Sequence, residues 1–438
     1  MQKKWSRIFA LAMGIPLLLV LLAACGGTGT TGTTPTAAAN VVIKVATELP
    51  VSGAEATDGK PAENGAHMAV DEANAANFIP GYTLVFVPKD DVGASGTHDP
   101  TVGATNVTAL IGDAQVAGIM GPFNSSVAKA EMPIANQAPI VLISPSNTNQ
   151  CLTRRGADIG CVGPNDLIST LRPTGKVTYF RVATTDDHQG GVGADFLYKT
   201  QGYKTAYVID DTETYGVGIA NTFIKEYQAD GGKVLGHDSI KKTTDYTGEL
   251  TKVAAAKPDV IYFAGVEANG GLQIRKQMVS TAGLQKTPFA GGDGLQDSAF
   301  ATAIGATTGG PVYSSVAAVD ATKVPSAATF IANYKAKYGA LGAYSAGGYD
   351  AMKILLAAIK AAIAGGAKAP TSSSDSATAQ TFRQAVIDQV AKTDYNGVTG
   401  HQSFDANGDT TNKTVSIYQL ATVNGAPGWQ YVTAITLP

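Results

Sequence analysis

Residues 205–232 read TAYVIDDTETYGVGIANTFIKEYQADGG and contain the unit that recurs along the chain. The first part, TAYVIDD, is a short run of β-branched and apolar residues, typical of a buried strand. In the second part apolar side chains recur at helical spacing until two glycines end the pattern, so a helix is predicted over 215–232. The positions that carry this spacing are Ala220, Phe223, Ile224 and Tyr227.

The same alternation of strand and helix continues on both sides of this stretch. Helices are predicted over 65–77, 127–135 and 345–364, and the pattern runs twice, over about 41–145 and 176–315. Alternation of this kind predicts parallel sheets covered by helices, here two doubly wound α/β lobes joined by a hinge, with a ligand cleft between them. The other strand candidates are IKVATELP, TLVFVPKDD, VAGIMG, PIVLISPS, TYFRVAT, DVIYFAGV and PVYSSV.

Composition and charge exclude several classes of protein. Of 438 residues, 44% are hydrophobic and only 15% are charged, which provides a large core and argues against a disordered chain. The formal net charge is −3, and no stripe of basic residues is present. A mildly acidic chain of this kind is a poor nucleic-acid binder, so no nucleic-acid partner is expected.

The first 40 residues indicate export and membrane attachment. Residues 1–24 combine a basic start, MQKKWSR, with an apolar run too short to span a bilayer, and are predicted to be a signal peptide. The following Cys25 lies in LAACG, which resembles the bacterial lipobox; the alternative is an ordinary signal peptide with a cysteine by chance. Residues 25–40 are rich in Gly and Thr and are predicted to be a flexible tether. We therefore expect an extracytoplasmic protein, lipid-anchored to the cell membrane at Cys25.

Cys151 and Cys161 are the two remaining cysteines. Because exported thiols commonly pair, a Cys151–Cys161 disulfide is predicted; two free buried thiols are the alternative. No further Cys or suitably spaced His completes a zinc site, and neither a metal nor a cofactor is expected.

Motifs of the common enzyme classes are missing from the sequence. There is no Gly-x-Ser-x-Gly elbow, no His-Glu-x-x-His and no phosphate-binding Gly-x-x-x-x-Gly-Lys loop. Acid pairs such as those at 90–91, 186–187 and 210–211 follow strands and suit turns and helix caps. The run at 405–409 is read as a hairpin turn, because it lacks the pattern of a calcium loop. An enzyme is not expected; a hydrolase using Asp293 or Asp186 is the remaining enzymatic alternative.

Two loops of small residues are candidates for a binding site. GPFNSS at 121–126 and SPSNT at 144–148 each follow a predicted strand. Hydroxyl groups and free backbone N–H groups at the start of a helix can bind an anion such as a carboxylate. The alternative is that these residues only cap helices.

Five co-linear groups of motifs carry a family resemblance that covers nearly the whole chain after the tether. They are PVSGA with GAHMAV; GPFNSS with PIVLISPSNTN; YFRVATTDDHQG; AYVIDDTETYGVGIANTF; and GGYDAMKILLAAI, with NGVTGHQSFDANGD near the C-terminus. On these motifs the chain resembles the leucine/isoleucine/valine-binding proteins, which are extracytoplasmic receptors of ABC importers with the type I periplasmic-binding fold. The resemblance implies lobe 1 over 41–184 and 316–392, and lobe 2 over 185–315 and 393–438.

The resemblance also implies a binding site for an amino acid. In the family the ligand carboxylate is held by hydroxyls and amides of the first lobe, at positions that match Ser125, Ser146 and Thr148. The ammonium is held by the Thr148 position and by an acid of the second lobe, which matches Asp293, and a tyrosine matching Tyr215 closes over the ligand. Asn147, in the same loop as Thr148, completes this set of candidate contacts.

The chain departs from the family pattern at two places that bear on specificity. Asp58 stands where branched-chain receptors carry an aromatic residue, and Val266 followed by Glu267 stands in place of a tyrosine. A polar or cationic ligand side group would pair with Asp58 or Glu267, although both residues could instead lie in water at the rim.

The expected function is therefore that of a monomeric receptor which closes on an amino acid and delivers it to an ABC permease. The amino acid is of the branched-chain type or more polar. The alternative is a sensor of the same fold that reports a small amide or carboxylate to a signalling partner.

Overall fold

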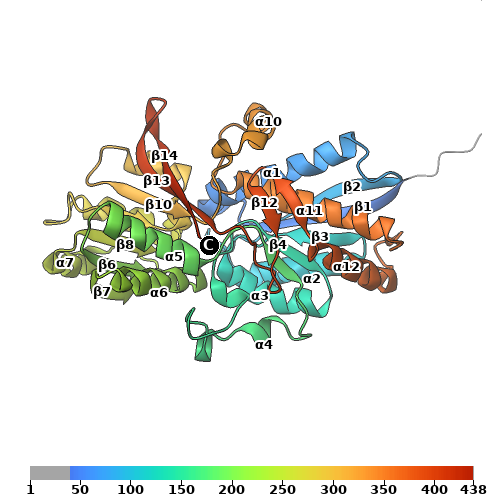
Figure 1. The fold of residues 1–438 in the computed structure, drawn as a ribbon, viewed down its shortest axis with the longest axis horizontal. Helices are drawn as coiled ribbons and strands as arrows, with labels where there is room; N and C mark the ends of the chain where they lie inside the picture. Colours follow the sequence, from blue (N-terminus) through green and yellow to red (C-terminus); the bar gives the residue numbers. More distant parts are fainter. Residues whose placement is uncertain (1–39, 438) are drawn as a thin grey trace, which may run out of the picture. The chain divides into compact units, whose positions relative to one another are not determined.

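Two sheets, each covered by helices on both faces, organise the chain (Figure 1). The computed structural model describes residues 40–437. The predicted signal peptide, the lipidation site Cys25 and most of the tether lie outside the described residues. Within them, no helix has the length and apolar character needed to cross a bilayer.

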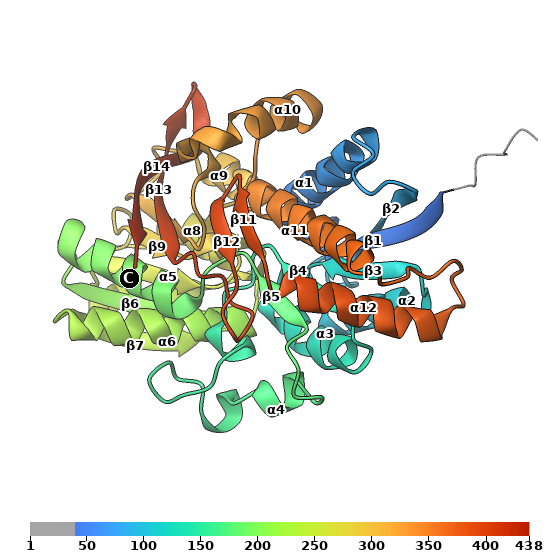
Figure 2. The same cartoon turned by 45° about the vertical axis from the view of Figure 1, so that its right-hand side comes forward.

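The first sheet has five parallel strands in the order β2-β1-β3-β4-β5. Helices α1, α11 and α12 pack on one face, and α2 and α3 pack on the other (Figure 2). The strands are β1 (Val41–Leu49), β2 (Tyr82–Asp90), β3 (Val116–Met120), β4 (Val141–Ser144) and β5 (Tyr179–Arg181). The helices associated with this part are α1 (Ala56–Ala75), α2 (Pro100–Gly112), α3 (Ser125–Gln137), α4 (Ile168–Leu171), α10 (Ala328–Tyr338), α11 (Ser345–Ala364) and α12 (Ser376–Val390).

The second sheet has seven strands in the order β14-β13-β10-β9-β8-β6-β7. Its first five strands in sequence are parallel, and β13 and β14 add an antiparallel edge. The strands are β6 (Thr205–Asp210), β7 (Lys233–Ser239), β8 (Val260–Ala264), β9 (Phe289–Gly291), β10 (Val312–Val316), β13 (Thr414–Val423) and β14 (Ala426–Thr436). Its helices are α5 (Asp186–Asp195), which continues into a π-helical segment (Phe196–Thr200), α6 (Thr214–Ala229), α7 (Thr247–Ala256), α8 (Gly271–Met278) and α9 (Ser298–Ile304).

The two sheets share one topology. The order β7-β6-β8-β9-β10 repeats the order β2-β1-β3-β4-β5, which is the doubly wound arrangement whose ligands bind at the carboxyl ends of the strands. This confirms the predicted fold class, and we refer to the two sheets with their helices as lobe 1 and lobe 2. One detail of the predicted repeat was wrong: the strand at 179–181 pairs with β4, so it closes the first sheet rather than opening the second.

Three segments cross between the lobes, at residues 182–185, 317–320 and 404–413. They are hydrogen-bonded to one another, because Thr184 N donates to Ala317 O (2.9 Å) and the Ser416 hydroxyl, at the start of β13, donates to Ala318 O (2.8 Å).

The third crossing comes later than the expected position near 393. The hairpin of β11 (Asp394–Gly397) and β12 (Gly400–Ser403) stays with lobe 1 instead. The reason is Asp350 of α11, whose buried carboxylate accepts hydrogen bonds from the backbone amides of Val398 (3.0 Å) and Thr399 (2.8 Å).

Short 3-10 helices fill several loops, and the region between β4 and β5 also contains a cross-link. Cys151 and Cys161, the predicted pair, are bonded in the structure with their Cα atoms 5.2 Å apart. The loop they close reaches lobe 2, where the Lys225 ammonium donates to Asp158 O. The 3-10 helices are Gly53–Glu55, Gln150–Leu152, Gly163–Asn165, Glu267–Asn269, Asp293–Leu295, Ala321–Lys323 and Pro325–Ala327.

Candidate functional site

A cavity lies between the lobes, in loops that follow the carboxyl ends of β1, β3, β4, β6, β8 and β9 and in the turn before α11. Its empty space is about 420 Å³, part of which is open to solvent. Both lobes contribute to its wall, as expected for two doubly wound sheets facing each other. The lining residues are Asp58, Phe123, Asn124, Ser125, Ser146, Thr148, Tyr215, Val266, Asp293, Gly294, Ala343 and Tyr344.

The lobe 1 wall combines hydroxyl groups with the N-terminus of a helix. Ser125 is the first residue of α3, and no side chain caps this helix end. The first-turn amides of α3 therefore lack intrahelical acceptors and carry the positive end of the helix dipole. Ser146 and Thr148 come from the loop after β4, where the Ser146 hydroxyl donates to Phe123 O (2.8 Å). This wall suits a carboxylate.

The lobe 2 wall is organised around the carboxylate of Asp293, which follows β9. Its Oδ1 accepts hydrogen bonds from the Tyr215 hydroxyl (2.8 Å) and from Gln189 Nε2 (2.8 Å). Its Oδ2 accepts one from the Tyr344 hydroxyl (2.7 Å), which belongs to lobe 1, so this bond joins the two lobes. Burial raises the pKa of Asp293, and the three hydrogen bonds oppose that rise.

Gly292 permits this arrangement, because a Cβ atom at that position would lie 2.2 Å from the Tyr215 hydroxyl. Any side chain there would displace the tyrosine from Asp293.

Acidic side chains dominate the electrostatics of the cavity. The pKa of Asp58, in the first turn of α1, is raised well above its usual value, mainly by burial and then by the charges of Asp297, Glu267, Glu55 and Asp293. Burial likewise raises the pKa of Glu267 to about 8, with Asp297 the next contributor. No lysine or arginine is among the lining residues.

Of the candidate residues, Asn147 and Glu267 are not on the cavity wall. The Asn147 amide is buried and has structural partners: its Oδ1 accepts from the Tyr179 hydroxyl (2.8 Å) and its Nδ2 donates to Phe123 O (2.6 Å). Glu267, which begins the 3-10 helix after Val266, is buried. Ser125, Ser146, Thr148, Tyr215, Asp293 and Asp58 all line the cavity.

The sequence did not reveal the buried ion pair that fixes the backbone of the loop after β4. The Arg181 guanidinium, 0% exposed, pairs with Asp409 (Nε to Oδ1, 2.7 Å). It also donates to Asn149 O (2.8 Å) and to Asn147 O (3.3 Å), and so holds the backbone on either side of Thr148. Asp409 was read only as part of a turn, and no local signal links it to an arginine 228 residues away.

A second missed group holds the loop before α3. Glu55 accepts from His98 Nδ1 (2.8 Å) and from Asn124 Nδ2 (3.2 Å), while His98 Nε2 lies 3.1 Å from the Ser126 hydroxyl. Serine, histidine and glutamate are thus connected in the order of a hydrolytic triad. Ser126, however, is not among the residues that line the cavity.

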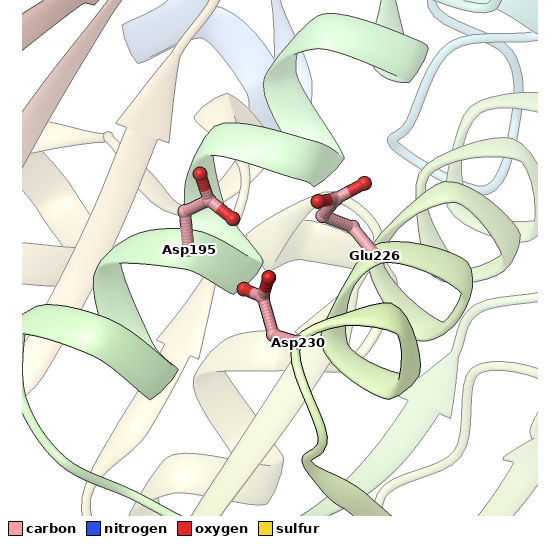
Figure 3. A group of neighbouring side chains, drawn as sticks. All are labelled: Asp195, Glu226 and Asp230. Atoms are coloured by element: carbon pink, nitrogen blue, oxygen red, sulfur yellow. The ribbon is translucent and has the colours of Figure 1, made fainter.

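Three carboxylates outside the cavity approach one another closely enough to suggest a cation site (Figure 3). Asp195 of α5 and Glu226 and Asp230 of α6 have oxygens within 4.8 Å of one another. The Lys199 ammonium lies 2.7 Å from both Asp195 and Asp230, so two of the three carboxylates already have a lysine as their counter-charge.

Comparison with known proteins agrees with this geometry. The profile of the periplasmic binding protein family matches residues 42–426. The Leu/Ile/Val-binding protein BraC3 of Rhizobium johnstonii is 29% identical over 326 residues, which are 74% of this chain and 80% of that protein.

Solved structures show the same fold. The branched-chain amino acid transporter substrate-binding protein LivJ of Streptococcus pneumoniae, in complex with isoleucine, matches with a TM-score of 0.70 at 26% identity, covering 90% of this chain and 99% of LivJ. A solute-binding protein of an ABC transporter from R. palustris, in complex with benzoate, matches with a TM-score of 0.68 at 21% identity. This match covers 90% of the present chain and 97% of the R. palustris protein. The chain belongs to the periplasmic binding protein family, and Leu/Ile/Val-binding proteins are among its relatives, in agreement with the resemblance predicted from the motifs.

Proposed function

We propose that this protein is the extracytoplasmic substrate-binding component of an ABC importer, and that it binds an amino acid in the cavity between its lobes. The observation that carries the proposal is the pairing of two unlike walls. Hydroxyls and helix amides face the cavity from lobe 1, and a carboxylate held by three donors faces it from lobe 2. An α-amino acid presents one charge of each sign and matches both walls.

In the proposed complex the α-carboxylate binds at Ser125, Ser146 and Thr148, with the first-turn amides of α3 completing its hydrogen bonds. The α-ammonium binds Asp293, and Tyr215 packs over the ligand. Charge-assisted hydrogen bonds of this kind contribute about 1.5–3 kcal/mol each where water is excluded. No bond is made or broken, and the proposed action is binding and release.

Contacts between the lobes support closure as the functional event. Asn149 Nδ2 of lobe 1 donates to Thr214 O of lobe 2 (2.6 Å), and Tyr344 donates to Asp293. A ligand that touches both walls stabilises the closed arrangement over an open one, because only the closed form completes all of its contacts.

The proposed surroundings of the protein follow from its N-terminus. A lipid on Cys25 and the tether over 25–40 would hold the receptor at the membrane surface as a monomer, next to an ABC permease. The Cys151–Cys161 bond suits an oxidising, extracytoplasmic location.

Thermal unfolding against amino acids, amides and aromatic acids tests the proposal. A ligand present at 1,000 times its Kd adds about 4 kcal/mol to the unfolding free energy, so an amino-acid ligand is expected to raise Tm visibly. Asp293→Asn keeps the size of the side chain but removes its charge, and should weaken binding at least about 30-fold, the lower end of the effect of breaking a buried charge pair. A response confined to aromatic acids would contradict the ammonium role of Asp293.

Gly218→Ala provides a matched test of closure. A methyl group at this position of α6 would lie 2.3 Å from Asn149 Nδ2, across the boundary between the lobes. Alanine favours a helix over glycine by about 1 kcal/mol, so lobe 2 should not lose stability. We expect weaker ligand binding with an unchanged or higher Tm of the ligand-free protein; unaltered affinity would show that closure does not require this contact.

A further inference from the structure

We infer that the ligand is an amino acid whose side chain ends in a cation, and that Asp58 is the partner of that cation. This inference rests on the proposed function and deepens it, because it names the class of amino acid. It departs from the aliphatic ligands in the names of the relatives.

Asp58 is the first observation. Its carboxylate is on the cavity wall, and within the described part of the chain it has neither a hydrogen bond nor an ion pair. Asp293, which lines the same cavity from lobe 2, accepts three hydrogen bonds. The cavity therefore holds two carboxylates of which only one has its charge stabilised by the protein.

Asn124 is the second, independent observation. It lines the cavity at only 6% exposure, and its Oδ1 has no hydrogen-bond partner. The orientation of the amide follows from Glu55, which can only accept and therefore takes the Nδ2 hydrogen (3.2 Å). A buried acceptor without a donor is costly, and a ligand N–H group would satisfy it.

The surrounding charges favour a cation over a neutral polar group. Asp297, Glu267, Glu55 and Asp293 all disfavour the ionised form of Asp58, and no basic group is among the main contributors to its pKa. A positive ligand group would gain from all of these acids together, and a neutral amide would gain only hydrogen bonds. Leucine or isoleucine would offer no side-chain donor to Asp58 or to the buried Asn124 Oδ1.

The arrangement divides the ligand into three parts. Its α-carboxylate faces the lobe 1 hydroxyls and its α-ammonium faces Asp293, so the remaining acceptors, Asp58 and Asn124 Oδ1, belong to the end of the side chain. The aromatic residues Phe123, Tyr215 and Tyr344 also line the cavity and suit the aliphatic stem or face of a cationic side chain.

Calorimetric titration of the full-length protein with two matched pairs of amino acids tests this inference. L-arginine and L-citrulline differ by one charge at the end of the side chain, and L-lysine and L-norleucine differ by the terminal ammonium. We expect the cationic member of at least one pair to bind at least tenfold more tightly than its neutral partner. L-leucine should bind no better than L-norleucine.

Asp58→Asn should abolish this preference, bringing the two members of the pair within about threefold of each other, while the affinity for the neutral member stays within threefold of wild type. The matched control is Asp388→Asn, which removes the same charge from an exposed position of α12. Asp58 has no hydrogen bond to lose, so folding should not suffer, and circular dichroism checks this.

Three results would overturn the inference. The first is that the neutral member of both pairs binds as tightly as the cationic member. The second is that L-leucine binds most tightly of all, and the third is that the preference for the cationic member survives in Asp58→Asn. Binding of any amino acid in these experiments leaves the proposed function standing. Failure of every amino acid to bind would instead overturn the proposed function together with the inference.

Discussion

Two buried clusters of ionisable side chains border the first sheet, and their buried carboxyl groups are stabilised in different ways. In the arginine cluster, Arg181 lies between Asp409 and the carbonyl groups of the loop after β4. In the carboxyl cluster, Glu48 at the end of β1 faces Asp91 after β2 and Glu131 of α3. All three acids of the second cluster are fully buried.

The carboxyl cluster has no cation. Among residues 40–437 no basic side chain pairs with its three acids, and its one side-chain donor is Asn106 Nδ2, which lies 3.1 Å from Glu48 Oε1. Burial raises the pKa of each acid, and the neighbouring carboxyl groups add to the rise for Asp91 and Glu131. These groups therefore retain protons at pH values at which an exposed carboxyl is ionised.

The difference shows that a buried carboxyl can be stabilised by a counter-charge or by a proton. The arginine cluster uses a counter-charge and also positions Thr148 through the loop. The carboxyl cluster uses protons, so its contribution to stability depends on pH, whereas an arginine remains charged throughout the physiological range.

The largest effect is expected from Arg181→Met. Removal of the guanidinium leaves Asp409 with only the partly exposed Arg154 as a counter-charge (3.2 Å) and takes the donor away from the carbonyls of Asn147 and Asn149. Breaking a buried pair typically costs about 3–5 kcal/mol, and the remaining Arg154 should keep the loss near the lower value. The unfolding free energy from guanidinium chloride titration measures the loss. In the double variant Arg181→Met/Asp409→Leu part of it should return, and equal losses in the single and double variants would contradict the counter-charge role.

The pH dependence of stability should follow the carboxyl cluster. Its folded pKa values lie above the unfolded values of about 3.8–4.5, so the folded protein binds more protons between the two. The unfolding free energy must then fall as pH rises above about 4.5, by ~1.4 kcal/mol for each pKa unit titrated.

Asp211 (pKa about 7) and Glu267 (pKa about 8) act in the same direction, with their losses complete near pH 7 and pH 8. The stabilising protonation of His98, whose pKa is raised, is also lost as pH rises through its folded pKa. Acids with lowered pKa values, such as Asp187 and Asp210, affect stability only below about pH 3.8. Denaturant titrations at pH 5 and pH 8 should therefore show the more stable protein at pH 5.

Glu131→Gln isolates one member of the carboxyl cluster. The amide is neutral at every pH and has nearly the size of the protonated acid, so the variant should gain on the order of 1 kcal/mol at pH 8 and little at pH 5. Unfolding titrations at the two pH values measure how much smaller the difference in unfolding free energy between pH 5 and pH 8 becomes in the variant. A variant that is equally destabilised at both would indicate that Glu131 is ionised and has a partner.

The smallest effect is expected at the partly exposed cluster of Figure 3, formed by Asp195, Glu226 and Asp230. Lys199, whose side chain is half exposed, pairs with Asp195 and Asp230, and ion pairs near the surface typically contribute less than about 1 kcal/mol. Lys199→Met should therefore change stability by about 0.5 kcal/mol, measured in the same titrations. A loss as large as that of Arg181→Met would show that burial is not what distinguishes the clusters.

The fold was largely predictable because its strong elements have strong local patterns. The eight predicted strands correspond to β1–β6, β8 and β10, most of which are short runs of buried apolar residues, and α11 lies where it was expected. In the two large sheets β7, β9, β13 and β14 were not identified: β7 is half exposed without alternation, β9 has only three residues, and β13 and β14 form an antiparallel edge that the predicted parallel repeat did not include. The end of the first sheet depended on β4–β5 pairing, which no local pattern reports.

The candidate site was predictable to the extent that its residues follow strands or match family motifs. Ser125, Ser146, Thr148, Tyr215 and Asp293 were named in this way and line the cavity. Asp58, which also lines it, was named because it departs from the family pattern. Gln189, Tyr344 and Asn124 were not, since their roles depend on partners far away in sequence: Gln189 lies 104 residues from Asp293, and Asn124 lies 69 residues from Glu55. Asn147 matched a loop position, but its amide is used inside lobe 1.

The three crossing segments have a mechanical consequence. The first segment is hydrogen-bonded to the second through Thr184 and Ala317, and the second is hydrogen-bonded through Ala318 to Ser416 of β13, the strand that the third segment enters. We therefore expect the three segments to move together as one ribbon rather than independently. Such a ribbon bends easily about an axis that runs across it and resists torsion, since twisting would shear these bonds. Opening and closing should therefore follow a single angular coordinate, and each closing movement returns Tyr344 to the same place on Asp293.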